Sequence, residues 1–436
     1  MSIELLTIAL IVSLLVFLFL GLPVAFSLIG VTTVFYLILR GPTALYLLFS
    51  VTFKTSITDV YIAAPLFCFM ACVLEFSGLG TAMYDMMHKW MAGLRGGLAM
   101  GTVLISTILA AMTGLSATAV VMMGVLALPE MLKRGYNKNM AVGCIPFGGA
   151  LGPLIPPSLL AIILGAFASL SIGKLFMGGI FPGLLASFLA CVYIGVRSFR
   201  RPELAPALPP DERATWKEKF VSLRVVLPTI ILIILVLGSI YTGVCTPTEA
   251  GGLGAIGAII CAIIYRNLTW TNIKSALLVT LRIFCMVLWL MIGGGFFASL
   301  MSSSGITHFI GSALIGMPLS TMGLVAVMML IGLIMGMLMD YVSIIMITIP
   351  IFMPVVIELG VDPIWFALLF CINMIIGLIT PPFGINLFYM KGLVPPGINL
   401  ADIYRSTLPY VIILLIVLSL CFVFPEILTW LPDRMG

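Results

Sequence analysis

The stretch Asn373-Met-Ile-Ile-Gly-Leu-Ile-Thr-Pro-Pro-Phe-Gly-Ile-Asn386 interrupts a long apolar segment with glycine, proline and polar residues. Pro381 and Pro382 remove two backbone donors and disfavour the helical conformation at the residue that precedes them, Thr380. A helix that enters this stretch must therefore break near Thr380 and restart after it. Irregular backbone at membrane depth is tolerated only where it lines a cavity or is buried in protein. The stretch predicts a broken helix whose carbonyl oxygens and new N-terminus are available to ions.

The composition of the whole chain indicates the class of protein. Of 436 residues, 62% are apolar and 8% are charged, whereas soluble proteins carry about 25% charged residues. This predicts an all-α polytopic membrane protein embedded in a lipid bilayer. The net charge of +5 comes mostly from the segments between apolar runs, which fits a cytoplasmic charge bias better than a surface for nucleic acid. The nine cysteines form no CxxC pair, and we interpret them as small apolar core residues.

Two apolar stretches, about 97–132 and about 320–357, differ from ordinary spans. Each is too short for two spans of about 20 residues joined by a turn. Small or polar residues lie at their middles, Gly114–Thr118 in the first and Asp340–Ser343 in the second. We predict that each is a re-entrant helical hairpin whose tip lies inside the membrane. A broken helix follows each hairpin, at about 139–169 and about 362–390.

The two halves of the chain resemble each other. A shift of 225 residues superposes Thr118 on Ser343, and it also aligns five glycines and prolines: Pro129 with Pro354, Gly135 with Gly360, Gly152 with Gly377, Pro156 with Pro381, and Pro157 with Pro382. Internal repeats of this kind are typical of transporters. We predict two repeats, at 1–197 and 224–436, joined by a linker at 198–223. Each repeat contains about five spans, one hairpin and one broken helix.

Charge predicts how the repeats are oriented. The segment after the first hairpin, Glu130–Lys138, is basic, and its counterpart Val355–Asp362 contains no Lys or Arg. By the positive-inside rule these segments lie on opposite sides of the membrane, so the repeats are inverted. The segment from Arg197 to Arg224 carries seven basic and four acidic residues, so the linker is predicted to be cytoplasmic. Both termini are then predicted to be periplasmic.

The polar residues of the hairpin tips and breaks are candidate ligands for sodium, because hydroxyl and carbonyl oxygens suit hard cations. The first predicted sodium site comprises Gly114, Ser116, Thr118, Gly149, Gly152 and Pro153. The second comprises Asp340, Ser343, Gly377, Thr380, Pro381 and Gly384. The alternative is that the prolines are structural kinks and the hydroxyls bond to their own helices. Catalytic constellations are missing from the spans, so we predict that the chain is not an enzyme.

Asp340 is the one acid placed centrally in an apolar stretch, where its burial costs a few kcal/mol. It is either a sodium ligand or a cap of the hairpin tip that faces water. Helices that restart at the tips and breaks point their N-termini toward the midplane, which favours an anion between them. The predicted substrate-binding residues are Ser116, Pro157, Ser158, Pro382 and Asn386. Lys and Arg are missing from the breaks, so no basic side chain clamps a carboxylate there.

Three motifs carry a resemblance to a known family: Gly152-Pro-Leu-Ile-Pro-Pro-Ser158, Cys245-Thr-Pro-Thr-Glu-Ala-Gly251 and Thr380-Pro-Pro-Phe-Gly384. With these motifs in this order, the chain resembles the large membrane subunit (M subunit, DctM-like) of tripartite ATP-independent periplasmic (TRAP) transporters over essentially its whole length. The resemblance implies an elevator-like fold of the ion-transporter superfamily. It also implies sodium-driven import of a small organic anion, a carboxylate or a sulfonate, with about two Na⁺ ions as co-transported ligands.

The resemblance also implies partners and a location. The partners are a small four-helix membrane subunit and a periplasmic substrate-binding protein, with no nucleic acid. The location is a bacterial or archaeal cytoplasmic (inner) membrane. The halves differ in one respect, because bulky Tyr341 stands where the first tip has Ser116, so the two sodium sites need not be equivalent.

Three other functions are compatible with parts of the pattern. A stand-alone sodium/anion symporter of related fold would take up its solute without a binding protein. A membrane-embedded lipid-modifying enzyme would need clustered acids or histidines near an interface, which the spans lack. A passive channel fits two re-entrant breaks in inverted halves less well than alternating access does. The sequence leaves the solute open among carboxylates, keto acids, sugar acids and sulfonates.

Overall fold

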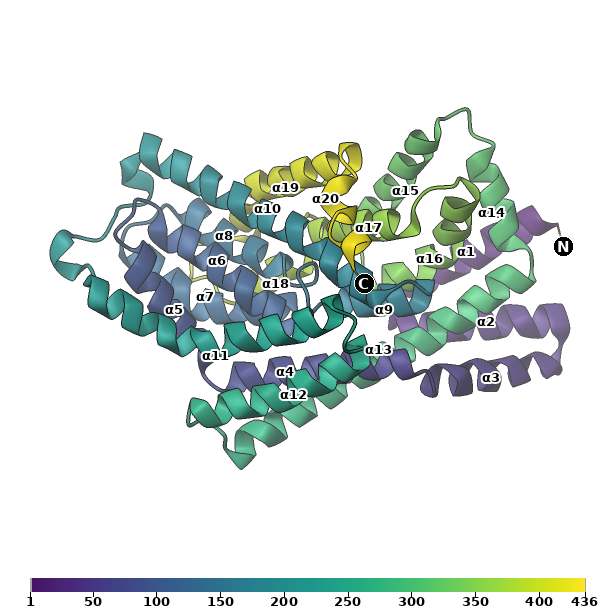
Figure 1. Ribbon diagram of the computed structural model, residues 1–436. Coiled ribbons are helices and arrows are strands. Elements are labelled where there is room, and N and C mark those ends of the chain that lie inside the picture. Colours follow the sequence, from purple (N-terminus) through teal and green to yellow (C-terminus); the bar gives the residue numbers. More distant parts are fainter. Residues whose placement is uncertain (1, 436) are drawn as a thin grey trace.

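The computed structural model describes residues 2–435, with the side chains of all these residues except Ala44 and Thr113. Every regular element in this part of the chain is a helix (Figure 1). Eight of the described helices are long and apolar enough to cross a membrane. The prediction of an all-α polytopic membrane protein is therefore confirmed.

The helices of the first half are α1 (Ile3–Phe19), α2 (Val24–Arg40), α3 (Leu45–Ser56), α4 (Ala63–Phe76), α5 (Leu79–Met91), α6 (Gly97–Thr113), α7 (Ser116–Lys133), α8 (Lys138–Ala150), α9 (Leu159–Ala168) and α10 (Ile172–Arg200). The helices of the second half are α11 (Trp216–Tyr241), α12 (Pro247–Ile264), α13 (Trp270–Ser303), α14 (Ile306–Ile315), α15 (Thr321–Gly336), α16 (Tyr341–Glu358), α17 (Pro363–Gly377), α18 (Ile385–Lys391), α19 (Leu400–Val423) and α20 (Glu426–Thr429). Short 3₁₀ turns are η1 (Pro42–Ala44), η2 (Asp59–Ile62), η3 (Pro202–Leu204), η4 (Pro210–Glu212) and η5 (Pro432–Arg434).

Local sequence explains where several of these helices begin. At the start of α12, the Thr246 hydroxyl accepts the backbone N–H of Glu249 at 3.3 Å, and the Glu249 carboxylate accepts the N–H of Thr246 at 2.8 Å. Pro247 occupies the first helical position, where its missing N–H costs nothing. The Cys245–Gly251 motif is therefore a capping box that defines the start of a span.

Two helical hairpins extend into the molecule from different sides. In Figure 1, α6 and α7 lie in the left half and α15 and α16 in the right half. Helix α6 ends at Gly114, which has a left-handed conformation with φ of +61°, and α7 begins two residues later. Helix α16 begins at Tyr341, and the side chain of the preceding residue, Asp340, caps it. The hairpin turns are thus short.

Two helices break where the prolines predict a break. Helix α8 ends at Ala150 and α9 begins at Leu159, and α17 ends at Gly377 and α18 begins at Ile385. Each break contains a cis Pro–Pro peptide bond, at residues 156–157 and 381–382. Residues 151–158 of the first break are all buried, so this break lies inside the protein. In the second break, residues 378–380 are buried and Pro382 and Phe383 are exposed.

The predicted linker, 198–223, contains an irregular segment between two long helices. Helix α10 continues to Arg200 and α11 begins at Trp216, so this segment spans 201–215. Backbone N–H groups join it to the first half: Gly96 donates to the Ala205 carbonyl at 3.1 Å, Leu208 to Ala92 at 2.9 Å, and Asn137 to Leu204 at 2.7 Å. The linker therefore packs against the C-terminal end of α5 and the N-terminal ends of α6 and α8.

Charged groups reinforce this contact between the linker and the first hairpin. Arg134 forms ion pairs with Glu130 and, at 2.9 Å, with Glu212 of the linker. His88 Nε2 lies 4.0 Å from Glu130 Oε1. Burial and the Arg134 guanidinium lower the pKa of His88, so its ring is neutral at pH 7 and this contact is not a salt bridge.

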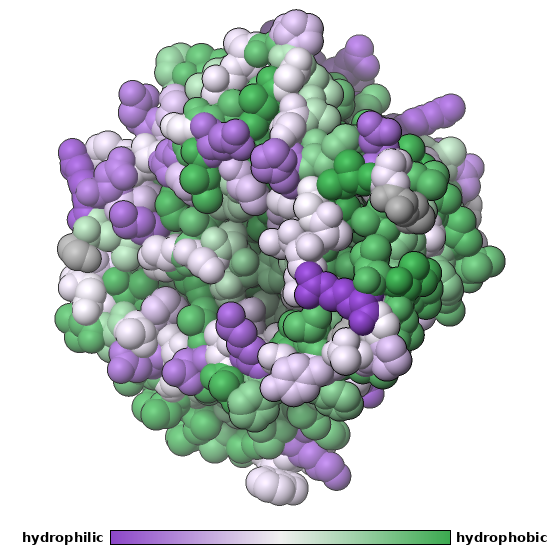
Figure 2. All heavy atoms as spheres, turned by 90° about the vertical axis from the view of Figure 1, so that its right-hand side faces the viewer, coloured by the Kyte–Doolittle hydropathy of each residue, from purple (hydrophilic) through white to green (hydrophobic). Residues whose placement is uncertain are grey.

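Large apolar side chains cover much of the outer surface. On α11 alone, the exposed ones include Leu227, Ile230, Ile231, Ile234 and Leu235. Figure 2 views the end of the molecule at the right of Figure 1, where polar residues are spread over the face and apolar residues predominate at the right and lower margins. Such a surface suits a protein whose sides contact lipid.

Candidate functional site

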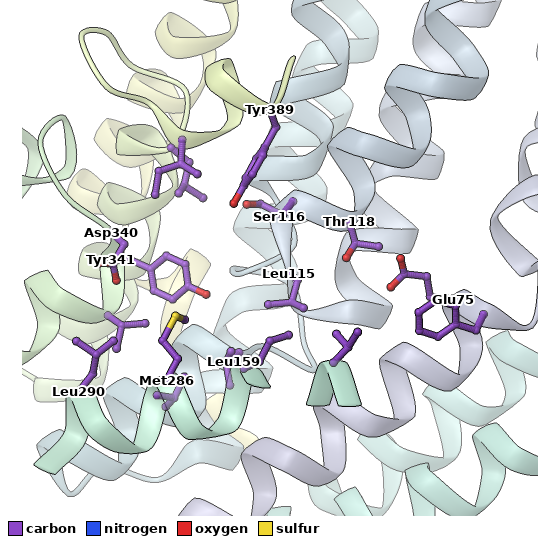
Figure 3. A pocket seen from close by; sticks show the side chains of 18 residues that line it. Glu75, Leu115, Ser116, Thr118, Leu159, Met286, Leu290, Asp340, Tyr341 and Tyr389 are labelled. Atoms are coloured by element: carbon purple, nitrogen blue, oxygen red, sulfur yellow. The ribbon is translucent and has the colours of Figure 1, made fainter. Parts of the chain in front are cut away.

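A cavity of about 490 Å³ lies where the two hairpin tips meet (Figure 3). Its walls come from α4, α7, α13, α16 and the residues around the second break. Most of its lining is apolar. The polar side chains that line it are Glu75, Ser116, Thr118, Asp340, Tyr341 and Tyr389. Residues from both halves of the chain thus form one site.

Three helix N-termini reach this cavity. Ser116 and Tyr341 are the first residues of α7 and α16, and Leu159 is the first residue of α9. A helix N-terminus carries partial positive charge and free N–H groups, so it favours an anion. At α16, Asp340 offsets part of this charge, because its carboxylate accepts the N–H of Ser343 at 3.1 Å and the Ser343 hydroxyl at 2.5 Å.

A buried hydrogen-bond chain joins the first tip to the second half. Ser116 Oγ donates to Asn386 Oδ1 at 2.9 Å, and Asn386 Nδ2 donates to the carbonyl of Pro146 at 3.1 Å. Asn386 is fully buried. The first hairpin, the first broken helix and α18 are therefore held together through one asparagine.

A second polar contact joins the first tip to α4. The Thr118 hydroxyl forms a side-chain hydrogen bond with Glu75, which lies in the last turn of α4. Figure 3 shows the oxygens of the two side chains facing each other at the edge of the cavity. Sequence reasoning misses Glu75, although a lone acid in an apolar segment is the same signal that singles out Asp340.

In the first predicted sodium site, the backbone of the break lies close to the backbone of the first hairpin. A Cβ atom on Gly149 would lie 2.9 Å from the Ser116 carbonyl oxygen, and one on Gly152 would lie 2.8 Å from that of Ala110. Only glycine allows the break to pack this closely against the hairpin.

The hydroxyl groups of the first site form hydrogen bonds to residues outside the site. Ser116 bonds to Asn386 and Thr118 to Glu75. The Pro153 carbonyl accepts a hydrogen bond from Ser158. Gly114 packs against the Pro157 carbonyl. In the first site, the break and the hairpin therefore contact each other through backbone atoms, and the Ser116 and Thr118 side chains bond to residues outside the site.

In the second predicted sodium site, the tip and the break also touch through backbone. A Cβ atom on Gly377 would lie 2.7 Å from the Gly336 carbonyl oxygen, and the N–H of Phe383 donates to the carbonyl of Met337 at 3.2 Å. The Thr380 hydroxyl donates to Ile376 of its own helix at 2.6 Å, which matches the structural alternative for this residue.

The remaining residues of the second site have distinct positions. Asp340 and Ser343 bond to each other at the tip. Pro381 belongs to the cis Pro–Pro bond, and Gly384 has φ of +34° immediately before α18. The second site thus consists of the Asp340 carboxylate at the hairpin tip and the backbone carbonyl groups of the neighbouring break.

Of the five residues predicted to bind substrate, only Ser116 lines the cavity. Ser158 is fully buried and caps α9 by accepting the N–H of Ala161 at 3.0 Å. The Pro382 carbonyl accepts the hydroxyl of Tyr404 at 2.6 Å. Pro157 packs against Gly114, and Asn386 lies behind Ser116. Pro157, Ser158 and Asn386 therefore lie behind the residues that line the cavity, and Pro382 is exposed away from it.

Clusters of strong metal ligands do not occur among residues 2–435, where no three His, Cys, Asp or Glu side chains gather. A cation bound near the tips would therefore be held mainly by hydroxyl and carbonyl oxygens. Such ligands suit hard ions and do not suit zinc or iron.

Paired hairpins and broken helices around one cavity form an architecture that is typical of transporters. The fold is similar to that of the Alcanivorax borkumensis YdaH transporter, with a TM-score of 0.61 and 16% identity over 94% of this chain and 97% of that chain. Residues 11–427 match the family described as the tripartite ATP-independent periplasmic transporter, DctM component, and the chain belongs to this family.

Two relatives illustrate the range of the family. The C4-dicarboxylate TRAP transporter large permease protein DctM of Pseudomonas aeruginosa is 32% identical over 409 residues, with 94% of each chain covered. The 2,3-diketo-L-gulonate TRAP transporter large permease protein YiaN of Escherichia coli is 31% identical over 368 residues, with 84% of this chain and 85% of that protein covered.

The family establishes the general role of the chain. It is a multi-pass large permease subunit of a TRAP transporter, as the sequence motifs predict. Because its relatives are transport proteins, the prediction that the chain is not an enzyme is also confirmed. The family description calls the system tripartite, so the chain functions with other components.

Proposed function

We propose that this chain is the membrane permease of a sodium-driven importer for a small organic anion, a carboxylate or a sulfonate. One observation carries the proposal: a cavity between both hairpin tips receives the N-termini of α7, α9 and α16. Converging N-termini stabilise negative charge without a basic side chain. None of the described residues that line the cavity is Lys, Arg or His.

The charge of the solute is then balanced partly by co-transported cations. About two Na⁺ ions enter with it, one beside each tip. At the second tip, the two Asp340 oxygens offer about four acceptor positions, and Ser343 occupies two of them, so two are left for a sodium ion. At the first tip, carbonyl oxygens around Gly149 and Gly152 are the proposed ligands.

Two inverted repeats that move as an elevator are part of the proposal. Helices α7 (Ser116–Lys133) and α16 (Tyr341–Glu358) begin and end 225 residues apart, which is the shift that relates the two halves. Each break packs against its own hairpin through a glycine, Gly152 in the first half and Gly377 in the second. The moving body comprises the hairpins, the broken helices and α18, and α4, α12 and α13 belong to the static scaffold.

The proposed partners are a small four-helix membrane subunit and a periplasmic binding protein that delivers the solute. The relatives differ in the solutes their names give, C4-dicarboxylate and 2,3-diketo-L-gulonate, so the binding protein is proposed to select the solute first. The proposed location is a bacterial cytoplasmic membrane. The basic linker faces the cytoplasm and both termini face the periplasm.

Uptake by reconstituted proteoliposomes tests the proposal. The chain, its small subunit and its binding protein are reconstituted, and solute uptake is measured with an inward sodium or potassium gradient. We expect uptake only with sodium, and faster uptake with an inside-negative potential, because each excess positive charge gains about 2.3 kcal/mol per 100 mV. Equal uptake with potassium would refute sodium coupling. Uptake without the binding protein would favour a stand-alone symporter.

A further inference from the structure

A second cavity, of about 630 Å³, lies between α10 and α19, away from the hairpin tips. These helices pack side by side along the upper side of the molecule in Figure 1. The cavity is a groove on the outer surface whose apolar walls are Leu189, Val192, Val196, Ile413 and Ile416. Proteins that cross a membrane expose such grooves to lipid acyl chains.

One end of this groove is strongly basic. Arg197, Arg200 and Arg201 all line it, and no acidic residue does. Among the described residues, the ion pairs involve none of these three arginines. Arg197 Nη1 donates to the Tyr193 hydroxyl at 2.6 Å, which fixes its position. Three guanidinium groups without carboxylate partners thus lie at the mouth of an apolar groove.

The length of the groove matches one leaflet of a bilayer. Leu189 and Arg200 are both on α10, eleven positions apart. At 1.5 Å per residue they are separated by about 16 Å along the helix. Half of the hydrocarbon core is about 15 Å thick. An acyl chain in the apolar part would therefore place its headgroup phosphate at the arginines.

We propose that this groove binds an anionic phospholipid of the cytoplasmic leaflet, with the phosphate on Arg200 and Arg201 and one acyl chain against Val192 and Ile413. Guanidinium groups form strong, paired hydrogen bonds with phosphate oxygens. A net negative headgroup is required because the arginines lack acidic partners of their own. The site is distinct from the solute cavity and does not depend on the transported solute.

Native mass spectrometry of the chain purified with its small membrane subunit tests this proposal. Dioleoylphosphatidylglycerol (DOPG) or dioleoylphosphatidylcholine is titrated into the detergent, and the bound fraction is measured. We expect one DOPG to bind well above the background set by phosphatidylcholine. The double variant Arg200→Gln/Arg201→Gln should weaken DOPG binding about 30-fold, since each basic residue contributes about fivefold.

Two further variants and one competitor distinguish the contributions of the headgroup, the acyl chain and nonspecific charge to DOPG binding. Lys274→Gln/Arg282→Gln removes two exposed charges of α13 and should leave DOPG binding unchanged. Val192→Trp fills the groove but keeps all three arginines, and it should also weaken binding. Glycerol phosphate without acyl chains should not compete.

Three outcomes would overturn the proposal. The first is equal binding of both lipids to the wild-type complex, which would also be seen if the small subunit occupied the groove. The second is equal loss of DOPG from both double variants. The third is competition by glycerol phosphate that matches competition by DOPG, which would identify a site for free phosphate esters.

Discussion

Ser116 Oγ lies 2.9 Å from Oδ1 of Asn386, a residue 270 positions later in the chain. Both residues are candidate substrate ligands by sequence, yet they bond to each other. Because Asn386 also bonds to Pro146, the first tip and α18 cannot separate without leaving buried polar groups unpaired. This relationship makes the two halves one mechanical unit around the cavity.

Replacing Asn386 by Ala should lower the free energy of unfolding by about 1–3 kcal/mol, because the Pro146 carbonyl and the Ser116 hydroxyl lose their partner. Ser116→Ala should cost less, since Asn386 keeps its bond to Pro146. The double variant should show a coupling of about 0.6 kcal/mol. Reversible unfolding in detergent measures all three.

A matched pair tests whether that coupling is specific. The buried Ser198 of α10 donates to the Ile194 carbonyl at 2.7 Å and to Met140 Sδ at 3.8 Å, and it bonds to neither Ser116 nor Asn386. Ser198→Ala and Asn386→Ala should therefore be additive. Additivity of Ser116→Ala with Asn386→Ala would contradict the coupling.

Replacing Asp340 by Asn should raise the sodium concentration for half-maximal uptake at least about tenfold, because an amide oxygen carries no net charge for the ion. Asparagine caps helices as well as aspartate does, so α16 should still form. Asp362→Asn is the control, since Asp362 caps α17 by accepting the N–H of Ile364 at 2.8 Å. Unchanged sodium dependence in Asp340→Asn would leave Asp340 as a structural cap only.

Replacing Glu75 by Gln should lower the KM for an anionic solute by roughly fivefold, because a negative charge leaves the cavity wall. Glutamine retains a hydrogen-bond acceptor for Thr118. The control Glu358→Gln removes an exposed acid at the end of α16 and should not change KM. A KM that stays constant in Glu75→Gln would show that Glu75 does not sense the solute.

The thermal stability of the protein should decrease between neutral and mildly acidic pH, partly through His88. Burial and the Arg134 guanidinium lower the pKa of His88, so the unfolded chain binds this proton more readily. The contribution of His88 is complete above pH 6.5 and is lost as the pH falls through its lowered pKa. His88→Gln should reduce the difference in Tm between pH 7.5 and 5.5.

The exposed His308 provides the control for this pH effect. His308→Gln should keep the wild-type difference in Tm between the two pH values. If His88→Gln also keeps it, the half-buried His88 is not a source of the pH dependence.

Local rules explain why the breaks and hairpins could be predicted. Proline acts on its own and the preceding residue, so Pro156 and Pro381 indicate segments that cannot be helical; α8 and α17 end a few residues earlier, at Ala150 and Gly377. The partners of Ser116, Thr118 and Ser158 could not be predicted, because each depends on which helix packs opposite.

The contacts of the linker could not be predicted from the sequence either. The sequence predicts a connector between the halves, and the structure shows that its backbone bonds to Ala92, Gly96 and Asn137. Backbone groups carry no sequence signal of their own, so these bonds could not be predicted. Glu75 is a different case, because its isolation in an apolar run is visible in the sequence.

The most direct test of the central claim is a cryo-EM map of the complete transporter with sodium and its solute. We predict solute density between the first turns of α7 and α16, in contact with Ser116 and Tyr341. We also predict a separate sodium density beside Asp340. Solute density elsewhere, with the space between the hairpin tips empty, would contradict the claim that both tips form the transport site.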